Sequence, residues 1–256
     1  MNFTGKSVVV TGASAGMGRE AAIQFAAHGA KVLVNYTSAA EAAEETRDII
    51  AKAGGTAVVC KGDVSREEDA DRIIKTAVDE FGRVDVLINN AGVTSFIPFQ
   101  DLESATPEVW LRLYSVNVMG AFLCVRAAAR EMKKTGGGVI INNASVSGHR
   151  PQGSSIPYCS SKAAVLHMTR CLAIALGPEI RVCSVSPGYI KDTRWNAGRE
   201  NFDADKAVAD GVELSLLKKV GTAAEVAAAM LYLASDGADF CTGIDILVDG
   251  GRFFKV

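Results

Sequence analysis

The chain has 256 residues, of which 48% are hydrophobic and 22% charged, and 27 lysines and arginines stand against 29 aspartates and glutamates. This composition is typical of a globular protein, and because no basic block occurs we expect no nucleic-acid partner. No apolar run approaches the roughly 18 residues of a membrane span, and the opening MNFTGKS lacks a signal peptide's apolar core, so we expect a cytoplasmic protein without a membrane partner.

Short β-branched runs alternate with longer amphipathic stretches along the whole chain. The expected strands cover residues 6–12, 31–36, 56–64, 84–92, 138–145, 180–188 and 243–251. The expected helices cover residues 18–30, 40–55, 66–82, 106–134, 157–176 and 222–235, with a polar helical stretch in 191–219. Strands joined by helical crossovers of this length form a parallel sheet covered on both faces. Since no Pro/Ser-rich linker or repeat divides the chain, the pattern predicts a single α/β domain with a doubly wound parallel sheet.

A glycine-rich turn joins the first expected strand to the first expected helix. It reads TGASAGMG, with Gly12, Gly16 and Gly18 in the spacing G-x-x-x-G-x-G. Such a turn offers free N–H groups and the positive end of a helix dipole to a pyrophosphate. A tight turn without a ligand would use the same glycines, but the strand before it and the helix after it favour a dinucleotide site.

The stretch YCSSK places Tyr158 and Lys162 four residues apart, on one face of an expected helix. A free tyrosine has a pKa of about 10, and a neighbouring cation lowers that pKa by favouring the phenolate. The pair could therefore exchange protons near neutral pH, although such a spacing also arises readily by chance.

Four motifs occur together: TGASAGMG, NNAG at 89–92, YCSSK at 158–162 and SPG at 186–188. In this order and at these distances they resemble the short-chain dehydrogenase/reductase family, and the resemblance covers essentially the whole chain. Within the family the chain is similar to bacterial carbonyl reductases and sugar dehydrogenases, and its start resembles the ketoacyl reductases. The resemblance implies a Rossmann-type domain, an NADP or NAD cofactor, and interconversion of a secondary alcohol with a ketone or an aldehyde. It also implies a homotetramer.

The resemblance carries the family's catalytic group onto Asn117, Ser145, Tyr158 and Lys162. Tyr158 would give the proton in reduction and take it in oxidation, while Ser145 would hold the substrate oxygen. Lys162 would lower the pKa of Tyr158 and bond the nicotinamide ribose, and Asn117 would position a water that leads to Lys162. Ser147 is a competing hydroxyl for Ser145, and the Asn117 amide could instead satisfy backbone groups.

The remaining expected cofactor contacts follow the strand ends. Asp63 and Val64 match the family position that holds the adenine, although Asp63 could also cap the following helix. The family usually has a threonine after the SPG motif, where this chain has Asp192, with Thr193 one residue later. The expected cofactor-binding residues are Gly12, Ser14, Gly16, Met17, Gly18, Asn35, Thr37, Ser38, Asp63, Val64, Asn90, Ala91, Gly92, Tyr158, Lys162, Pro187, Gly188, Ile190 and Thr193.

The end of the second expected strand bears on the choice of cofactor. In dinucleotide folds a carboxylate there grips the adenine ribose and repels a 2′-phosphate. Asn35 occupies the position expected for that acid, and Asn35, Thr37 and Ser38 could donate hydrogen bonds to a phosphate. Ala15 stands where NADP-preferring relatives often carry a cation. We therefore expect a modest preference for NADP(H), with NAD(H) also accepted.

The sequence is less specific about the substrate. The segment 191–219 is expected to be a mobile lid, because it follows Pro187 and Gly188 beside the nicotinamide. Side chains of 147–156 and 189–216 are expected to shape the pocket, without identifying the small alcohol or carbonyl compound that it takes. The three histidines share no ligand spacing, so no metal site is expected. A catalytically silent dinucleotide-binding sensor or scaffold of the same fold remains the alternative to an enzyme.

Overall fold

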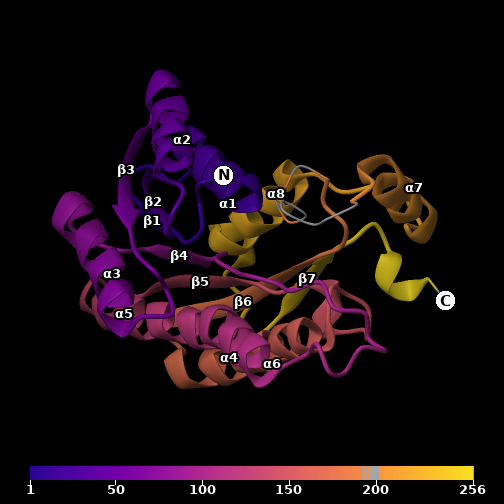
Figure 1. Cartoon of the computed structure of the whole chain (residues 1–256). Coiled ribbons are helices and arrows are strands. Elements are labelled where there is room, and N and C mark those ends of the chain that lie inside the picture. The colour runs from indigo at the N-terminus through magenta and orange to yellow at the C-terminus, as the bar shows by residue number, and fades with distance from the viewer. Residues whose placement is uncertain (192, 194, 196–201, 256) are drawn as a thin grey trace.

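A seven-stranded parallel sheet forms the centre of the molecule (Figure 1). The computed structural model describes residues 1–191, 193, 195 and 202–255. The strands are β1 (Ser7–Val10), β2 (Lys31–Tyr36), β3 (Thr56–Lys61), β4 (Val86–Asn89), β5 (Gly138–Asn143), β6 (Ile180–Pro187) and β7 (Asp245–Val248). Their order is β3-β2-β1-β4-β5-β6-β7, so the winding reverses between β1 and β4. Doubly wound sheets bind ligands at the carboxyl ends of the strands at such a reversal. The predicted fold class is confirmed.

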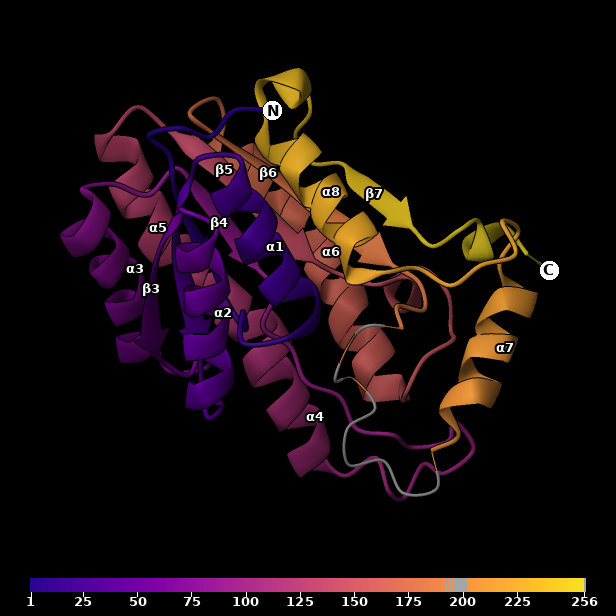
Figure 2. The same cartoon turned by 90° about the horizontal axis from the view of Figure 1, so that it is seen from above.

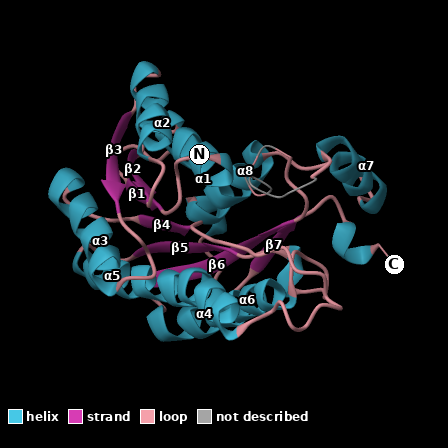
Figure 3. Cartoon of the chain, viewed as in Figure 1, coloured by secondary structure: helices cyan, strands magenta, loops and turns pink. Residues whose placement is uncertain are grey.

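Helices cover both faces of the sheet (Figure 3). One apolar core includes residues of α1 (Gly16–Ala27), α2 (Ala40–Lys52) and α8 (Ala223–Ala234), and a second core includes residues of α3 (Glu67–Phe81), α5 (Ala121–Lys134) and α6 (Ile156–Leu176). Along β1, Val8 and Val10 face the first core and Val9 faces the second. Because both faces are buried, the strands are apolar at nearly every position and show no polar alternation.

The helix expected over 106–134 contains an irregular turn. It consists of α4 (Pro107–Tyr114), a π-helical turn over Ser115–Gly120 and α5. Such π-turns occur frequently at functional sites, and this one carries Asn117. By length and composition Pro107–Lys134 is the one described helix that could cross a membrane. However, Leu123, Cys124 and Met132 of α5 belong to the core beneath the sheet, as in a core helix.

The segment expected to form a lid is helical over α7 (Ala204–Leu214). Asp192 and residues 194 and 196–201 of this segment lie outside the described residues. The residues after β7 form a turn, residues 249–255, which we call the C-terminal turn. Figure 2 shows α7 beside the C-terminal turn, at one end of the molecule. The two are joined by hydrogen bonds from Leu217 N and Ser215 Oγ to Gly250 O, each 3.1 Å long. This end of the molecule is therefore formed by two segments, one before β7 in the sequence and one after it.

Candidate active site

The glycine turn is shaped by close contacts with the end of β4. Gly12 has a φ of +61°, and a Cβ there would lie 2.9 Å from Ala91 Cα. A Cβ at Gly18 would lie 2.4 Å from Asn90 Nδ2, which donates to Thr11 O and to Gly12 O at 3.0 Å. The N-terminus of α1 has no side-chain cap and no acidic residue in its first turn. Its free N–H groups suit a pyrophosphate.

Asn35 does not have the predicted role. Its side chain is buried, with 1% of its surface exposed. Asn35 Nδ2 donates to Cys60 O at 3.2 Å and to Gly62 O at 3.0 Å, while Oδ1 accepts from Gly12 N at 3.2 Å. The amide therefore ties β2 to the glycine turn and to the residues after β3, and has no donor left for a phosphate. The half-buried Tyr36 and the exposed Thr37 and Ser38 are the residues at this strand end that a ribose could reach.

Asp63 and Val64 both have structural contacts after β3. Asp63 Oδ1 accepts from Ser65 N at 3.0 Å and from Ser65 Oγ at 2.7 Å. The alternative of a carboxylate that caps the following helix is not observed, because the Asp63 carboxylate bonds within the turn before α3 and the N-terminus of α3 has no side-chain cap. Val64 is buried against Gly120, where an added Cβ would lie 2.7 Å from Val64 Cγ2. The adenine contact of both residues stays a prediction.

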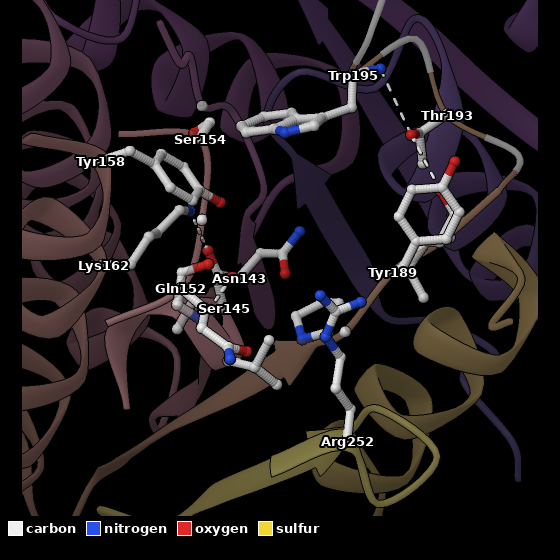
Figure 4. A pocket seen from close by; sticks show the side chains of 18 of the residues that line it. Asn143, Ser145, Gln152, Ser154, Tyr158, Lys162, Tyr189, Thr193, Trp195 and Arg252 are labelled. Carbon is white, nitrogen blue, oxygen red and sulfur yellow. Dashed lines mark hydrogen bonds between the residues drawn. The ribbon is translucent and has the colours of Figure 1, made fainter. Parts of the chain in front are cut away.

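The four residues expected to be catalytic come from three segments. Ser145 follows β5, Tyr158 and Lys162 lie in the first turns of α6, and Asn117 lies in the π-turn. Ser155 caps α6 by accepting from Tyr158 N at 3.3 Å, so the helix begins where the tyrosine is needed. Figure 4 shows Ser145, Tyr158 and Lys162 on one side of a shared pocket.

Burial controls the protonation of Tyr158 and Lys162. It raises the pKa of Tyr158, and the neighbouring Ser145 hydroxyl lowers that pKa only in part. Burial also lowers the pKa of Lys162 to about 8. The net shift of the Tyr158 pKa is therefore upward, and the expected lowering of that pKa by Lys162 stays a prediction. The ammonium lies 5.8 Å from the centre of the tyrosine ring and donates to Asn143 O at 2.7 Å, so it does not offset the loss of solvent.

Asn117 has the structural partners that its alternative role requires. Its Oδ1 accepts from Val93 N at 2.8 Å, and its Nδ2 donates to Val93 O and to Ser161 Oγ, both at 3.0 Å. A Cβ added at Gly92 would lie 3.4 Å from Asn117 Oδ1 and 3.7 Å from Lys162 Nζ. The amide and the ammonium therefore border the same small space above Gly92, which suits a water between them.

A cavity of about 200 Å³ collects most of the predicted residues. An adjoining cleft extends from it to the glycine turn. Residues that line one or both are Gly12, Gly16, Met17, Asn90, Ala91, Gly92, Ser145, Tyr158, Lys162, Pro187, Gly188, Ile190 and Thr193. Residues that line neither are Ser14, Gly18, Asn35, Thr37, Ser38, Asp63, Val64 and Asn117. Thr193 borders both spaces, and a Cβ at Gly16 would lie 3.5 Å from it.

The C-terminal turn forms a wall of the cavity that the sequence analysis missed. Arg252 and Phe253 line the cavity. Arg150 Nη1 donates to the backbone carbonyls of Arg252, Phe253 and Lys255 at 3.1, 2.9 and 2.7 Å. His149 Nε2 lies 2.9 Å from Asp245 Oδ2 at the start of β7. Asn143, which also lines the cavity, was missed as well, and its position two residues before Ser145 was the available signal.

The comparisons with known proteins decide the family. Residues 12–252 match the family model described as enoyl-(acyl carrier protein) reductase. A protein of Streptomyces violaceoruber, assigned as ketoacyl reductase 2 of the granaticin polyketide synthase, is 41% identical over 95% of this chain and 94% of its own length. The chain belongs to the short-chain dehydrogenase/reductase family. The name of a further relative mentions the cofactor. L-rhamnose 1-dehydrogenase (NAD(P)(+)) of Azotobacter vinelandii is 36% identical over 98% of both chains.

A solved structure has a fold similar to that of this chain. The 7α-hydroxysteroid dehydrogenase complexed with NADH and 7-oxo glycochenodeoxycholic acid superposes with a TM-score of 0.87. It is 32% identical and covers 98% of this chain and 95% of its own. Members of the short-chain dehydrogenase/reductase family are oxidoreductases that use a nicotinamide dinucleotide, and the residues present here fit one. The glycine turn at Gly12 leaves an uncapped helix end, and Asn143 Oδ1 is buried beside the cavity without a partner among the described residues.

Proposed function

We propose that the protein interconverts a secondary alcohol and a ketone or an aldehyde, with Tyr158 as the general acid and base. The observation that carries the proposal is that Ser145, Tyr158 and Lys162 line one cavity, with Lys162 almost fully buried. A nicotinamide cofactor would supply or accept the hydride at this site. Hydride addition builds negative charge on the carbonyl oxygen, and the two hydroxyls can both donate to that oxygen.

The pKa directions suit reduction at neutral pH. Because burial raises the pKa of Tyr158, its phenol keeps a proton that it can donate as the alcohol forms. In the oxidative direction Tyr158 must first be a phenolate, and the buried ammonium of Lys162 stabilises that charge. Asn117 and a water above Gly92 would then pass the proton taken from the alcohol through Lys162 to solvent. We expect oxidation to require a higher pH than reduction.

Both nicotinamide cofactors are proposed to bind, with a modest preference for NADP(H). No carboxylate stands among Tyr36, Thr37 and Ser38, so nothing at this strand end repels a 2′-phosphate. The rhamnose dehydrogenase named for NAD(P)(+) supports dual use, and the steroid dehydrogenase solved with NADH supports binding of the unphosphorylated form.

We also propose a cytoplasmic homotetramer. Large apolar side chains are exposed on the helices and near the edge strand that the resemblance assigns to assembly: Leu111, Met119, Phe122, Ile174, Phe240 and Ile244. A folded monomer rarely exposes so many large apolar side chains along two neighbouring helices, so we expect a second copy of the chain to bury them.

The test of catalysis is Tyr158→Phe, which removes the hydroxyl and keeps the ring. On any substrate found in a panel of ketones, sugars and acyl thioesters, kcat should fall by at least about 100-fold while cofactor affinity stays unchanged. Tyr232→Phe, on the exposed face of α8, is the matched control and should keep full activity. If the wild-type protein binds cofactor tightly yet converts nothing in the panel, the sensor or scaffold replaces the enzyme.

A further inference from the structure

The charged side chains around the cavity are all cationic. Among the described residues that line it, Arg150, Lys162 and Arg252 carry charge, and none of these lining residues is an aspartate or a glutamate. The whole chain, in contrast, has a net charge of −2. The cavity is therefore a local concentration of positive charge in a slightly acidic protein, and such a pocket attracts anions.

Two of the three cations already have hydrogen-bond acceptors within the protein. Lys162 donates to Asn143 O beside Tyr158, and Arg150 donates to three backbone carbonyls of the C-terminal turn. Arg252 differs, because its guanidinium has no hydrogen bond and no ion pair within the described part of the chain. Figure 4 shows it extending from the C-terminal segment toward the space between Ser145 and Tyr189. Its guanidinium, which carries five N–H donors, thus points into the pocket without an acceptor among the described residues.

The backbone that carries Arg252 is fixed by several contacts. Asp249 Oδ1 accepts from Gly251 N at 2.8 Å, and Asp249 Oδ2 accepts from Phe253 N at 2.6 Å. Arg150 holds the carbonyls of the same turn. Asp249 and Asp210 act on the charge of Arg252 from a distance, but neither forms an ion pair with it. The half-buried guanidinium is held in place by its main chain rather than by a partner for its charge.

Arg252 lies on the side of the pocket away from the glycine turn. It borders the cavity that contains Tyr158 and an outer groove of about 1020 Å³, whose walls include Phe99, Tyr189 and Leu214. It does not border the cleft that contains Gly12 and Gly16. A pyrophosphate bound at the glycine turn is therefore not its partner, and a substrate that enters through the apolar groove passes it before reaching Tyr158.

We propose that Arg252 binds a carboxylate of the substrate, so that the preferred substrates are oxo acids and the matching hydroxy acids with an apolar body. The inference rests on the oxidoreductase function proposed above. A single guanidinium matches the two oxygens of a carboxylate in a bidentate pair. A phosphate dianion would leave a second charge facing Tyr189, Trp195 and Phe253, which line the same cavity. The two other cations of the cavity, Arg150 and Lys162, already donate to backbone carbonyls.

The test compares acids with their neutral esters. The probes are 4-acetylbenzoate and 4-oxopentanoate, each against its methyl ester, assayed as ketone reduction with NADPH and with NADH. The wild-type protein should prefer at least one acid. Arg252→Met should raise KM for that acid by about 10- to 100-fold, the range for a lost charge-assisted hydrogen bond, and leave the ester within about threefold. Arg252→Lys should give a KM for the acid between those of the wild-type protein and Arg252→Met, because the ammonium keeps the charge but cannot form a bidentate pair.

A control variant and a binding assay test the carboxylate site at Arg252 separately from the proposed oxidoreductase function. Arg47→Met removes a surface guanidinium that pairs with Asp48 and Glu44, and should change neither substrate. Calorimetric titration of the protein–cofactor complex with 4-acetylbenzoate should show binding that Arg252→Met abolishes. Equal turnover of acids and esters by the wild-type protein, or equal losses on both in Arg252→Met, overturns the carboxylate site and keeps the enzyme. Binding of the acid through Arg252 without turnover of any carbonyl overturns the enzyme and keeps the site.

Discussion

Lys162 should reduce the stability of the folded protein at neutral pH. Its side chain is 5% exposed, and Asn143 O is its hydrogen-bond acceptor. Burial lowers its pKa from 10.5 to about 8. At about 1.4 kcal/mol for each tenfold change in proton affinity, this difference makes the charged form about 3 kcal/mol less favourable in the folded state. Lys162→Met removes that cost and loses one hydrogen bond worth about 1–2 kcal/mol. The variant should therefore be more stable than the wild-type protein by about 1–2 kcal/mol at pH 7, although we expect it to be inactive.

The pH dependence identifies the cause. Between pH 8 and 10.5 the folded wild-type protein has released the Lys162 proton while the unfolded chain still holds it, so the wild-type protein gains stability as pH rises. Lys162→Met has no such gain, and its advantage should disappear by pH 10. The measurement is urea unfolding of the cofactor-free protein at one concentration, from pH 7 to pH 10. Lys52→Met, at the exposed end of α2, should show no pH-dependent difference. A Lys162→Met variant that is less stable at pH 7, or a gap that does not change with pH, refutes the reasoning.

Three further predictions concern the cofactor, the lid and assembly. Asn35→Asp should destabilise the fold by about 2–4 kcal/mol in urea unfolding, because its donors to Cys60 and Gly62 are lost. Tyr36→Asp should instead lower the NADP(H)/NAD(H) ratio of kcat/KM at least about tenfold; an unchanged ratio would remove Tyr36 from cofactor choice. Hydrogen exchange in α7 (Ala204–Leu214) should slow when cofactor and substrate bind together, and equal protection with and without them would exclude a lid. Light scattering at micromolar concentration should give about four times the 26.9 kDa of one chain, whereas the mass of a single chain would contradict the tetramer.

The fold could be predicted because its signals are local. β-branched runs, glycine stops and the glycine turn each lie within one element or one junction, and their alternation alone gives the parallel sheet. The element ends were less predictable, since they depend on tertiary contacts. The strand expected over 84–92 ends at Asn89, because Asn90 turns to bond the backbone of Thr11 and Gly12.

The candidate site was predictable where one helix face carries it and not where distant segments meet. Tyr158 and Lys162 lie four residues apart on α6, so the sequence alone places them together. Asn35 was misassigned because a strand buried on both faces gives no alternation by which to separate it from Tyr36. Arg252 had no sequence signal, since its place in the pocket depends on Arg150, which lies 102 residues earlier.

The hydrogen bonds from Arg150 to the C-terminal turn bear on which substitutions the pocket can accept. Arg150 holds backbone carbonyls, and every amino acid supplies a carbonyl. The side chain at position 252 is therefore not part of its own anchor, and another residue there would be presented to the substrate by the same turn. Phe253 differs, because its ring packs edge-on against His149 and Phe254. Saturation mutagenesis at position 252 can therefore alter the accepted molecules while Tyr158, Ser145 and the nucleotide site stay in place.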